Sequence, residues 1–373
     1  MMKESQQRMM QHSEVKIRLL KLYLEQYLNI LSASRYIGNI HLYDLFCGEG
    51  IYDGEGKGSP IVIMETIKNI YFQNKARGTQ NEKFNCHFND IVSSKVSKLK
   101  TEIENRKLHY KEIGELKYSE IDYRNLLPDV TKEINVLKNE KAFVFIDPYG
   151  YKDIKISDIK SLMQSGKSEV LLFLPTQFMF RFENKGTPEC LIEFINELMP
   201  VEKWPASETG IDFIENLTEA FRNSMGNSYF VDSFIITRDK NQFFCLFFFT
   251  SHIYGFDRML HAKWKIDEEE GRGWQYQIEH SLFSQVEKKA NIFKFEERLL
   301  DFLKTERSNS EVYEFTLHNG HLPVHGNEIL MKLQDDGKLN ATKADGTAAR
   351  KGAFYLNYKA FKGEPKKIKL KTK

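Results

Sequence analysis

Apolar residues recur in two patterns along the first part of the chain. Between 13 and 34, leucines and tyrosines recur at three- and four-residue spacing, which predicts an amphipathic helix. Beyond it, short apolar runs alternate with amphipathic segments. These runs lie at 40–46, 84–88, 118–121, 142–146 and 170–174. Buried strands separated by helices are typical of a parallel sheet whose two faces are both covered.

Two long apolar stretches, 229–237 and 243–250, follow this alternation with only a short polar connection between them. That arrangement predicts an antiparallel hairpin. Five parallel strands and a terminal antiparallel hairpin predict an α/β fold with a Rossmann-like sheet. Together with the N-terminal helix, this sheet is expected to form a first domain at 1–290.

The pattern changes again after about residue 290. Helical spacing at 295–303 and 321–337 is followed by two short β-rich segments, 339–342 and 353–358, around a turn at 344–346. Helices followed by a short hairpin predict a winged helix-turn-helix domain at 291–373. A segment of about 80 residues also admits other small α+β folds.

Composition indicates a globular protein stabilised by its core. Hydrophobic residues make up 41% of the 373 residues and charged residues 28%, as in ordinary globular domains. The 4 cysteines form no C-x-x-C pair, which excludes a disulfide scaffold and favours a cytoplasmic location. No apolar run approaches the roughly 18 residues of a membrane helix and no signal-peptide pattern opens the chain, so no membrane association is expected.

Charge is nearly balanced over the whole chain but not locally. The formal net charge is +2, yet residues 350–373 hold nine Lys or Arg and a single acid, Glu364. A basic end on a near-neutral chain favours nucleic-acid binding, with a solvated tail as the alternative.

The most informative motif follows the first predicted strand. Asp44 ends that strand, and Gly48 and Gly50 let the backbone approach a ligand closely. Asp53 and Glu55, in the loop beyond, would repel a phosphate but attract a cation. S-adenosylmethionine carries a sulfonium and an ammonium and no phosphate, so we expect it as the cofactor, with Asp44 at its ammonium. The alternative is a polar strand end with ordinary turn glycines.

Two further acids stand at predicted strand ends. Asp90 follows the second strand and is predicted to accept hydrogen bonds from ribose hydroxyls. Asp122 follows the third strand and is predicted to receive the adenine amino group. Each acid could instead cap the helix that begins after it. The full predicted cofactor set is Asp44, Phe46, Gly48, Gly50, Asp90 and Asp122, and no metal site is expected.

Asp147, Pro148 and Tyr149 follow a strong central strand and form the second motif. An acid at the carboxyl end of a buried strand points into the crevice in which such sheets bind ligands. Pro148 stiffens the turn, and Tyr149 offers a flat face on which a base can stack while its exocyclic amine donates to Asp147. These three residues are predicted to be catalytic. The alternative is a strand-to-turn transition with a core tyrosine.

Motifs for several other chemistries are absent from the sequence. It contains no H-E-x-x-H, G-x-S-x-G or G-x-x-x-x-G-K-[ST] pattern. Their absence disfavours zinc proteases, α/β-hydrolases and P-loop ATPases.

The two motifs and the terminal hairpin together resemble class I S-adenosylmethionine-dependent methyltransferases. More narrowly, nearly the whole chain resembles the three-Cys-motif partner protein family, TcmP. The segments that carry this resemblance are 19–31, 52–60, 145–150, 259–267 and 320–330. The resemblance implies a bacterial or phage setting and a protein partner with a three-cysteine motif.

The element at 147–150, Asp-Pro-Tyr-Gly, also resembles the Asp-Pro-Phe-Gly of tRNA dimethylguanosine methyltransferases. It is more loosely similar to the (Asp/Asn)-Pro-Pro-Tyr of adenine-N6 DNA methyltransferases, from which it departs by its single proline. Cytosine-C5 methyltransferases share an Asp-Leu-Phe-Cys-Gly start but need a Pro-Cys nucleophile. Pro148 has no cysteine beside it, which disfavours C5 chemistry.

We therefore predict S-adenosylmethionine-dependent N-methylation of an exocyclic amine of a base in DNA or RNA. The domain at 291–373 is predicted to bind duplex through a reader helix at 323–334 and a wing at 343–350. The predicted nucleic-acid contacts are His325, Asn327, Lys332, Lys343, Arg350 and Lys351. One alternative is a catalytically inactive, methyltransferase-like DNA-binding adaptor in a bacterial or phage defence or partner-protein system. Another is a small-molecule methyltransferase with a regulatory wing.

Overall fold

The computed structural model describes residues 2–52, 56–79, 82–183, 188–239, 242–275, 289–363 and 367–373. Asp53, Glu55 and Glu364 lie outside these residues. Contacts divide the chain into two compact units. The first contains residues 1–252 with 274–277, and the second contains residues 253–273 with 278–373.

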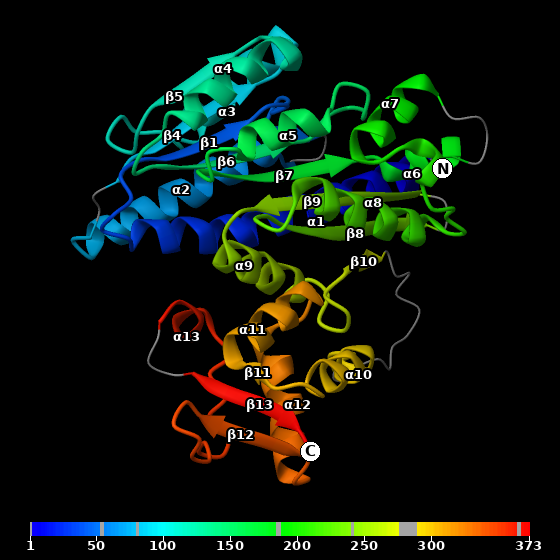
Figure 1. Ribbon diagram of the computed structural model, residues 1–373. Coiled ribbons are helices and arrows are strands. Elements are labelled where there is room, and N and C mark those ends of the chain that lie inside the picture. The colour runs from blue at the N-terminus through cyan, green and yellow to red at the C-terminus, as the bar shows by residue number, and fades with distance from the viewer. Residues whose placement is uncertain are drawn as a thin grey trace. The chain divides into compact units, whose positions relative to one another are not determined.

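The first unit is built on an eight-stranded sheet with the order β10-β8-β9-β7-β6-β1-β4-β5 (Figure 1). Five strands are parallel: β1 (Ile40–Asp44), β4 (Phe84–Asn89), β5 (Leu116–Ser119), β6 (Lys141–Ile146) and β7 (Ser168–Leu174). The hairpin of β8 (Phe230–Asp239) and β9 (Gln242–Thr250) is antiparallel, and β10 (Gly273–Gln275) extends the sheet beside β8. The predicted Rossmann-like sheet with its terminal hairpin is confirmed.

Helices cover both faces of this sheet. On one face α1 (Met2–Ser32) lies beside α2 (Ser59–Ala76), and Tyr23 and Tyr27 of α1 each lie 5.8 Å from the Phe143 ring, centroid to centroid (Figure 1). On the other face of the sheet Val144, the residue after Phe143, packs in a core with residues of four helices. These are α4 (Tyr123–Asn135), α5 (Ile156–Met163), α7 (Glu189–Leu198) and α8 (Gly210–Met225). Because both faces are buried, the strands have continuous rather than alternating apolar sequences.

The remaining elements of the first unit are short or lie at its edges. They are β2 (Ile51–Tyr52), β3 (Gly56–Lys57), α3 (Ser93–Asn105), α6 (Thr176–Glu183) and the 3-10 helix η1 (Val201–Lys203). In the described part of the chain, no helix is both long and apolar enough to cross a membrane.

Hydrogen bonds also attach α1 to the sheet. Glu169 of β7 is buried and accepts hydrogen bonds from the hydroxyls of Tyr23 and Thr250, the latter at 2.8 Å. The Tyr27 hydroxyl donates to the Ala142 carbonyl at 3.0 Å. Burial raises the pKa of Glu169, and its two hydroxyl donors oppose that rise. Such directional contacts fix the rotation of α1, and this rotation decides which of its side chains reach the carboxyl edge of the sheet.

The second unit combines four helices with a small sheet. The helices are α9 (Ile253–Trp264), α10 (Phe293–Phe302), α11 (Asn309–His318) and α12 (Pro323–Asp335). The sheet has the order β11-β13-β12, formed by β11 (Arg307–Ser308), β12 (Leu339–Lys343) and β13 (Ile368–Thr372), and a short helix, α13 (Tyr358–Lys362), precedes β13. This arrangement agrees with the predicted winged helix-turn-helix.

One predicted strand of this unit is wrong. Residues 353–358 form no strand, because Tyr355 has a left-handed φ of 53° that interrupts an extended backbone. Phe354 and Leu356 are nevertheless buried. The partner of β12 is β13, which pairs with it in antiparallel register and places Leu370 opposite Ala341.

The contacts divide the chain earlier than the predicted domain boundary at 290. Helix α9 belongs to the second unit, where the Tyr313 hydroxyl donates to Asp257 Oδ2 at 2.7 Å. Trp264 Nε1 also donates to the Gly320 carbonyl, at 2.9 Å. The amphipathic spacing of α9 resembles that of the helices before it, so the pattern alone does not indicate its change of unit.

Candidate active site

Adjacent strands bring three predicted aspartates to one edge of the sheet. In the strand order, β1 lies between β6 and β4, and the Cα partners of Asp44 are Phe145 and Phe88. Asp147 and Asp90 each stand two residues beyond these partners. The carboxyl ends of β6, β1 and β4 therefore place Asp147, Asp44 and Asp90 along the same edge, where open α/β sheets bind ligands.

Asp44 is fully buried and incompletely satisfied. Its Oδ1 accepts a hydrogen bond from the Phe46 amide at 3.3 Å, but its Oδ2 has no partner among the described residues. Burial raises the pKa of Asp44 to about 7, and the Asp147 carboxylate adds to that rise, while a hydrogen bond with the Ser59 side chain, the Phe46 amide and Lys16 oppose it. A buried carboxylate oxygen without a donor fits a ligand that presents an ammonium or a bound water.

Three glycines after β1, namely Gly48, Gly50 and Gly58, differ in how much space surrounds them. Gly48 and Gly50 have φ of 62° and 80°, in the region that favours glycine. A Cβ at Gly50 would lie 2.6 Å from Leu99 Cδ1, whereas a Cβ at Gly48 would meet nothing within 4 Å. A Cβ at Gly58 would lie 3.0 Å from the Gly50 carbonyl oxygen. Gly50 and Gly58 therefore permit close packing of the loop, and Gly48 leaves the open side that a ligand can approach.

Asp90 supports the glycine loop directly. It is buried, its Oδ2 accepts a hydrogen bond from the Gly48 amide at 3.2 Å, and its Oδ1 accepts one from the Val92 amide at 2.9 Å. The Lys95 ammonium lies 3.9 Å from the same Oδ2. Asp90 thus connects the end of β4 to the loop after β1. Its predicted contact with a ribose stays a prediction.

Asp122 caps a helix, which was the alternative to a cofactor contact that its place in the sequence allowed. It is exposed and is the N-cap of α4, where its Oδ1 accepts a hydrogen bond from the Arg124 amide at 2.9 Å. Next to it, the Tyr123 ring stacks on the Phe46 ring with 5.1 Å between centroids. The structure therefore accounts for Asp122 as a helix cap, and its predicted contact with adenine stays untested.

Asp147 is paired with a residue that the sequence analysis did not identify. Lys16 Nζ lies 2.5 Å from Asp147 Oδ2, and the two side chains are only 7% and 16% exposed. The ammonium also lies 4.4 Å above the Phe173 ring. Burial by itself lowers the pKa of Lys16, but Asp147, Tyr52 and Asp44 raise it above its ordinary value. Lys16 is therefore a permanent positive charge beside the two aspartates.

A signal for Lys16 was present in the sequence. The residue stands three and four positions before Leu19 and Leu20, which places it on the apolar face of the predicted helix. A lysine on such a face needs a buried partner. The sequence does not indicate that this partner is Asp147, 131 residues away.

The predicted catalytic residues Pro148 and Tyr149 differ in exposure. Pro148 is buried, whereas Tyr149 is 74% exposed. Lys95 Nζ lies 4.4 Å from the centroid of the Tyr149 ring and donates to its hydroxyl. Tyr52 of β2 is also near: burial raises its pKa, Lys16 opposes that rise, and Asp147, Asp44 and Tyr149 add to it. The site therefore combines buried charges with an exposed aromatic ring.

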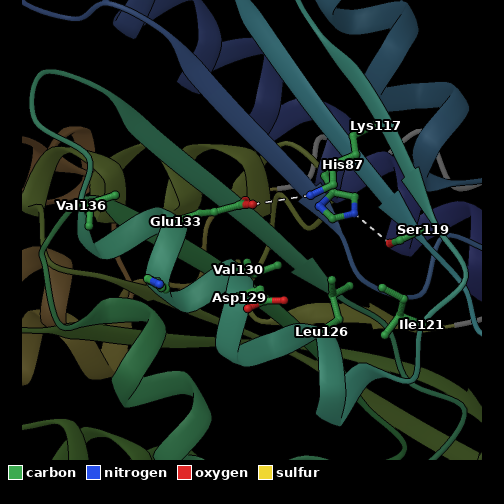
Figure 2. Close-up of a pocket in the computed structure, with 10 residues that line it drawn as sticks. His87, Lys117, Ser119, Ile121, Leu126, Asp129, Val130, Glu133 and Val136 are labelled. Atoms are coloured by element: carbon green, nitrogen blue, oxygen red, sulfur yellow. Dashed lines mark hydrogen bonds and ion pairs between the residues drawn. The ribbon is translucent and has the colours of Figure 1, made fainter.

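Two surface cavities are lined by residues that follow or neighbour these strand ends. One, of about 410 Å³, is lined by Tyr52 and Glu49 together with residues of α3. The other, of about 400 Å³, lies between β5 and α4 (Figure 2). At its base His87 is hydrogen-bonded through Nε2 to Ser119 Oγ at 2.8 Å, and burial lowers the pKa of His87 to about 4. No predicted site residue lines this second cavity among the described residues.

The structure contradicts the predicted nucleic-acid contact of His325. Its side chain is only 7% exposed, and its ring lies edge-on to Trp264 with 4.3 Å between centroids. His325 Nδ1 accepts a hydrogen bond from the Leu322 amide at 3.2 Å. Burial lowers the pKa of His325 to about 4. Its spacing from Ile329 and Leu330 places it on the inner face of α12, so it belongs to the core.

The other predicted contacts lie in different environments. Asn327 is half-buried; Lys332 is exposed but lies 2.8 Å from Glu296. Lys351 is exposed and pairs with Asp335 at 2.5 Å. Lys343 and Arg350 are exposed as well, and within the described ranges neither forms an ion pair.

Comparison with known proteins gives a family match for the second unit. Residues 266–346 match the GMT-like wHTH domain, which confirms the predicted winged helix-turn-helix. No curated protein sequence matches the chain.

Several solved methyltransferase structures are similar to part of the chain. An O-methyltransferase from Bacillus cereus, solved with SAH, has 12% identity and a TM-score of 0.33, and the match covers 61% of this chain and 80% of that one. A SAM-dependent methyltransferase from Clostridium acetobutylicum has 10% identity and a TM-score of 0.30, with 63% and 91% covered. Loganic acid methyltransferase with SAH has 11% identity and a TM-score of 0.31, with 60% and 74% covered. The fold itself is established by strand order: a Rossmann-like sheet of the methyltransferase type, followed by a winged helix-turn-helix.

Proposed function

We propose that this chain is an S-adenosylmethionine-dependent methyltransferase that acts on an exocyclic amine of a nucleic-acid base. The observation that carries the proposal is the buried Asp44 Oδ2, which has no donor among the described residues. Asp44 stands at the carboxyl end of β1, four residues before Gly48, and a Cβ at Gly48 would meet nothing within 4 Å, so that side is open to a ligand. The combination fits a cationic cofactor and does not fit a phosphate.

The residues that would hold the cofactor are Asp44, Gly48 and Asp90. Asp44 would bind the ammonium, and Asp90 keeps the Gly48 loop in the conformation that leaves its open side accessible. Ile91, which follows Asp90, is 59% exposed and offers an apolar surface to the adenine ring of the cofactor. Bound S-adenosylmethionine would supply an electrophilic methyl group on its sulfonium.

The acceptor would be held by Asp147 and Tyr149. Tyr149 presents an exposed ring at the strand edge, and base stacking on such a ring contributes about 1–3 kcal/mol. Lys16 occupies Asp147 Oδ2, which leaves Oδ1 for the amine of the acceptor, since no described residue donates to it. Lys16 also holds a positive charge beside Asp147 in a largely buried position.

The second unit supports nucleic acid as the acceptor. Its winged-helix match and the exposed Lys343 and Arg350 are features of a domain that contacts phosphates. Within the proposal, the resemblance to the TcmP family extends to a bacterial or phage setting and to a protein partner with a three-cysteine motif.

Calorimetric titration of S-adenosylmethionine into the full chain tests the cofactor site. We expect saturable binding that weakens at least about tenfold in Asp44→Asn, because the ammonium loses its charged partner. Asp129→Asn is the matched control: it changes an exposed acid of α4 outside the predicted cofactor set and should bind like the wild type. Absence of binding to the wild type, or equal binding by Asp44→Asn, would contradict the proposal. A labelled-methyl screen over DNA and RNA then tests the acceptor.

The ion pair of Lys16 and Asp147 favours a second candidate function. If the ammonium permanently blocks the acceptor carboxylate, the chain is an inactive, methyltransferase-like adaptor that binds DNA. This function requires DNA binding without methyl transfer under conditions in which the cofactor binds. Measurable transfer to any base that depends on Asp147 would exclude it.

A further inference from the structure

The outward face of α12 is poorly suited to a phosphate backbone. Its inward side buries Ile329 and Leu333. The exposed positions include Glu328 and Asp335, both acidic, and Val324, which is apolar and 59% exposed. The exposed lysine of this helix, Lys332, is paired with Glu296 at 2.8 Å. Acids directed at a phosphate backbone repel it. The predicted reader helix therefore lacks the charge that its role requires.

The small sheet of the same unit has the opposite character. Along β13, Ile368 and Leu370 are buried, and Lys369 and Lys371 are exposed between and beyond them. Lys373 continues this alternation on the outward side. Because β13 is the central strand of the sheet, its backbone is hydrogen-bonded on both edges. The lysines therefore project from a fixed backbone.

Polar, uncharged side chains lie between these lysines. The register places Asn340 opposite Lys371 and Thr342 opposite Lys369. Lys369 pairs with Glu306 at 2.7 Å, whereas Lys371 and Lys373 form no ion pair within the described ranges. Amides and hydroxyls between lysines are the groups that bind phosphate oxygens in nucleic-acid interfaces.

The face offers nothing to a lipid or to a protein hot spot. Of the large apolar side chains that are exposed in the described part of the chain, none belongs to β11, β12 or β13. Membrane surfaces and protein interfaces need such apolar anchors. Residues 367–373 form one row with a lysine at every second position, about 20 Å long at the usual rise of a strand. A linear polyanion with regularly spaced charges matches this row.

We infer that the outward face of the β11-β13-β12 sheet binds the phosphate backbone of nucleic acid without sequence preference, and that α12 is not the reader helix. The inference rests on the proposed function only for the statement that the chain binds nucleic acid. It assigns this binding to Lys369, Lys371 and Lys373, with Asn340 and Thr342 beside them.

Fluorescence anisotropy with a labelled duplex, at several salt concentrations, tests the inference in the full chain. The variant Lys371→Glu with Lys373→Glu should bind at least about tenfold more weakly, and its slope of log affinity against log salt should fall by about 2. The loss should be the same for duplex DNA and duplex RNA of any sequence. The matched control is Lys294→Glu with Arg298→Glu, which changes net charge equally on the exposed side of α10 and should stay within about threefold of the wild type. Lys332→Glu with Lys351→Glu tests the competing site beside α12, and we expect it to lose less affinity than the β13 variant. Circular dichroism confirms that all three variants fold.

The outcomes separate this inference from the proposed function. If the wild type binds the duplex and the β13 variant binds equally well, the inference is wrong and the proposed function stands. A control variant that loses as much affinity as the β13 variant, or more, also overturns it. If the wild type binds no nucleic acid at all, the proposed acceptor class fails as well.

Discussion

The two units use charge in opposite ways. At the carboxyl edge of the large sheet a few charges are buried, and Lys16 among them is paired with Asp147. On the outward face of the small sheet the charges are exposed and repeated, and two of them form no ion pair within the described ranges. Buried pairs depend strongly on each partner and weakly on salt, whereas exposed rows act additively and are screened. Burial therefore determines whether a lysine acts through a single partner or as one of a screened row of charges.

Removing Lys16 should give the largest effect on stability. Lys16→Met leaves Asp147 mostly buried without its cation, which should lower the free energy of unfolding by about 3 kcal/mol. Denaturant unfolding measures this loss. Lys21→Met is the control on the same helix, because Lys21 is 54% exposed and should change stability little. The double variant Lys16→Met with Asp147→Asn should recover most of the loss, and failure to recover would show that packing of Lys16, rather than its charge, is responsible.

Cofactor affinity should depend on pH through Asp44. With a pKa of about 7, this carboxyl is mostly neutral at pH 6 and mostly ionised at pH 8, so affinity for the cationic cofactor should rise about tenfold between them. Calorimetry at both pH values measures the change, and Asp44→Asn should show none. Equal pH dependence in the variant would assign the effect to another group.

The raised pKa of Asp44 has the opposite effect on the stability of the protein without cofactor: a rise in pH lowers the free energy of unfolding. Because the pKa of Asp44 is raised from 3.8 to about 7, the folded chain holds this proton more tightly than the unfolded chain does. Its contribution to stability is therefore largest below pH 4 and is lost as the pH rises to about 7. Unfolding of the wild type and of Asp44→Asn over this range should diverge towards neutral pH, and parallel curves would contradict the assignment.

Replacing the exposed Asp122, which follows the end of β5, should have the smallest effect of these changes. Asp122→Ala removes the N-cap of α4 and should lower stability by about 1 kcal/mol. Transfer activity and cofactor affinity should not change. A loss of cofactor binding larger than the loss of stability would restore Asp122 to the cofactor site and weaken the contrast between buried and exposed charges.

Local pattern predicted the parallel strands, the terminal hairpin and the acids at the strand ends. Asp44 and Asp147 follow buried strands, and the alternation of strands and helices places such ends together. Local pattern could not predict the partner of Lys16, because an ion pair across 131 positions depends on the rotation of α1 on the sheet. His325 was predicted to contact nucleic acid, although its spacing from Ile329 and Leu330 already placed it on the inner face of α12.

In the small sheet, local pattern also failed to predict which strands pair. A strand at 353–358 was predicted because aromatic and aliphatic residues cluster there, but Tyr355 has a left-handed backbone conformation. The true partner, β13, lay within a segment dominated by lysines. Its alternation of Ile368 and Leu370 with lysines was a strand pattern that the net charge of the segment concealed.

The central position of β13 has a consequence for the order in which the protein is made. The strand joins β11 to β12, yet it follows both of them along the chain. During synthesis the two outer strands leave the ribosome without the strand that connects them, and the sheet closes only after Thr372 has emerged. The lysine row on β13 is therefore the last part of this sheet to form, because β13 must insert between two strands that precede it along the chain.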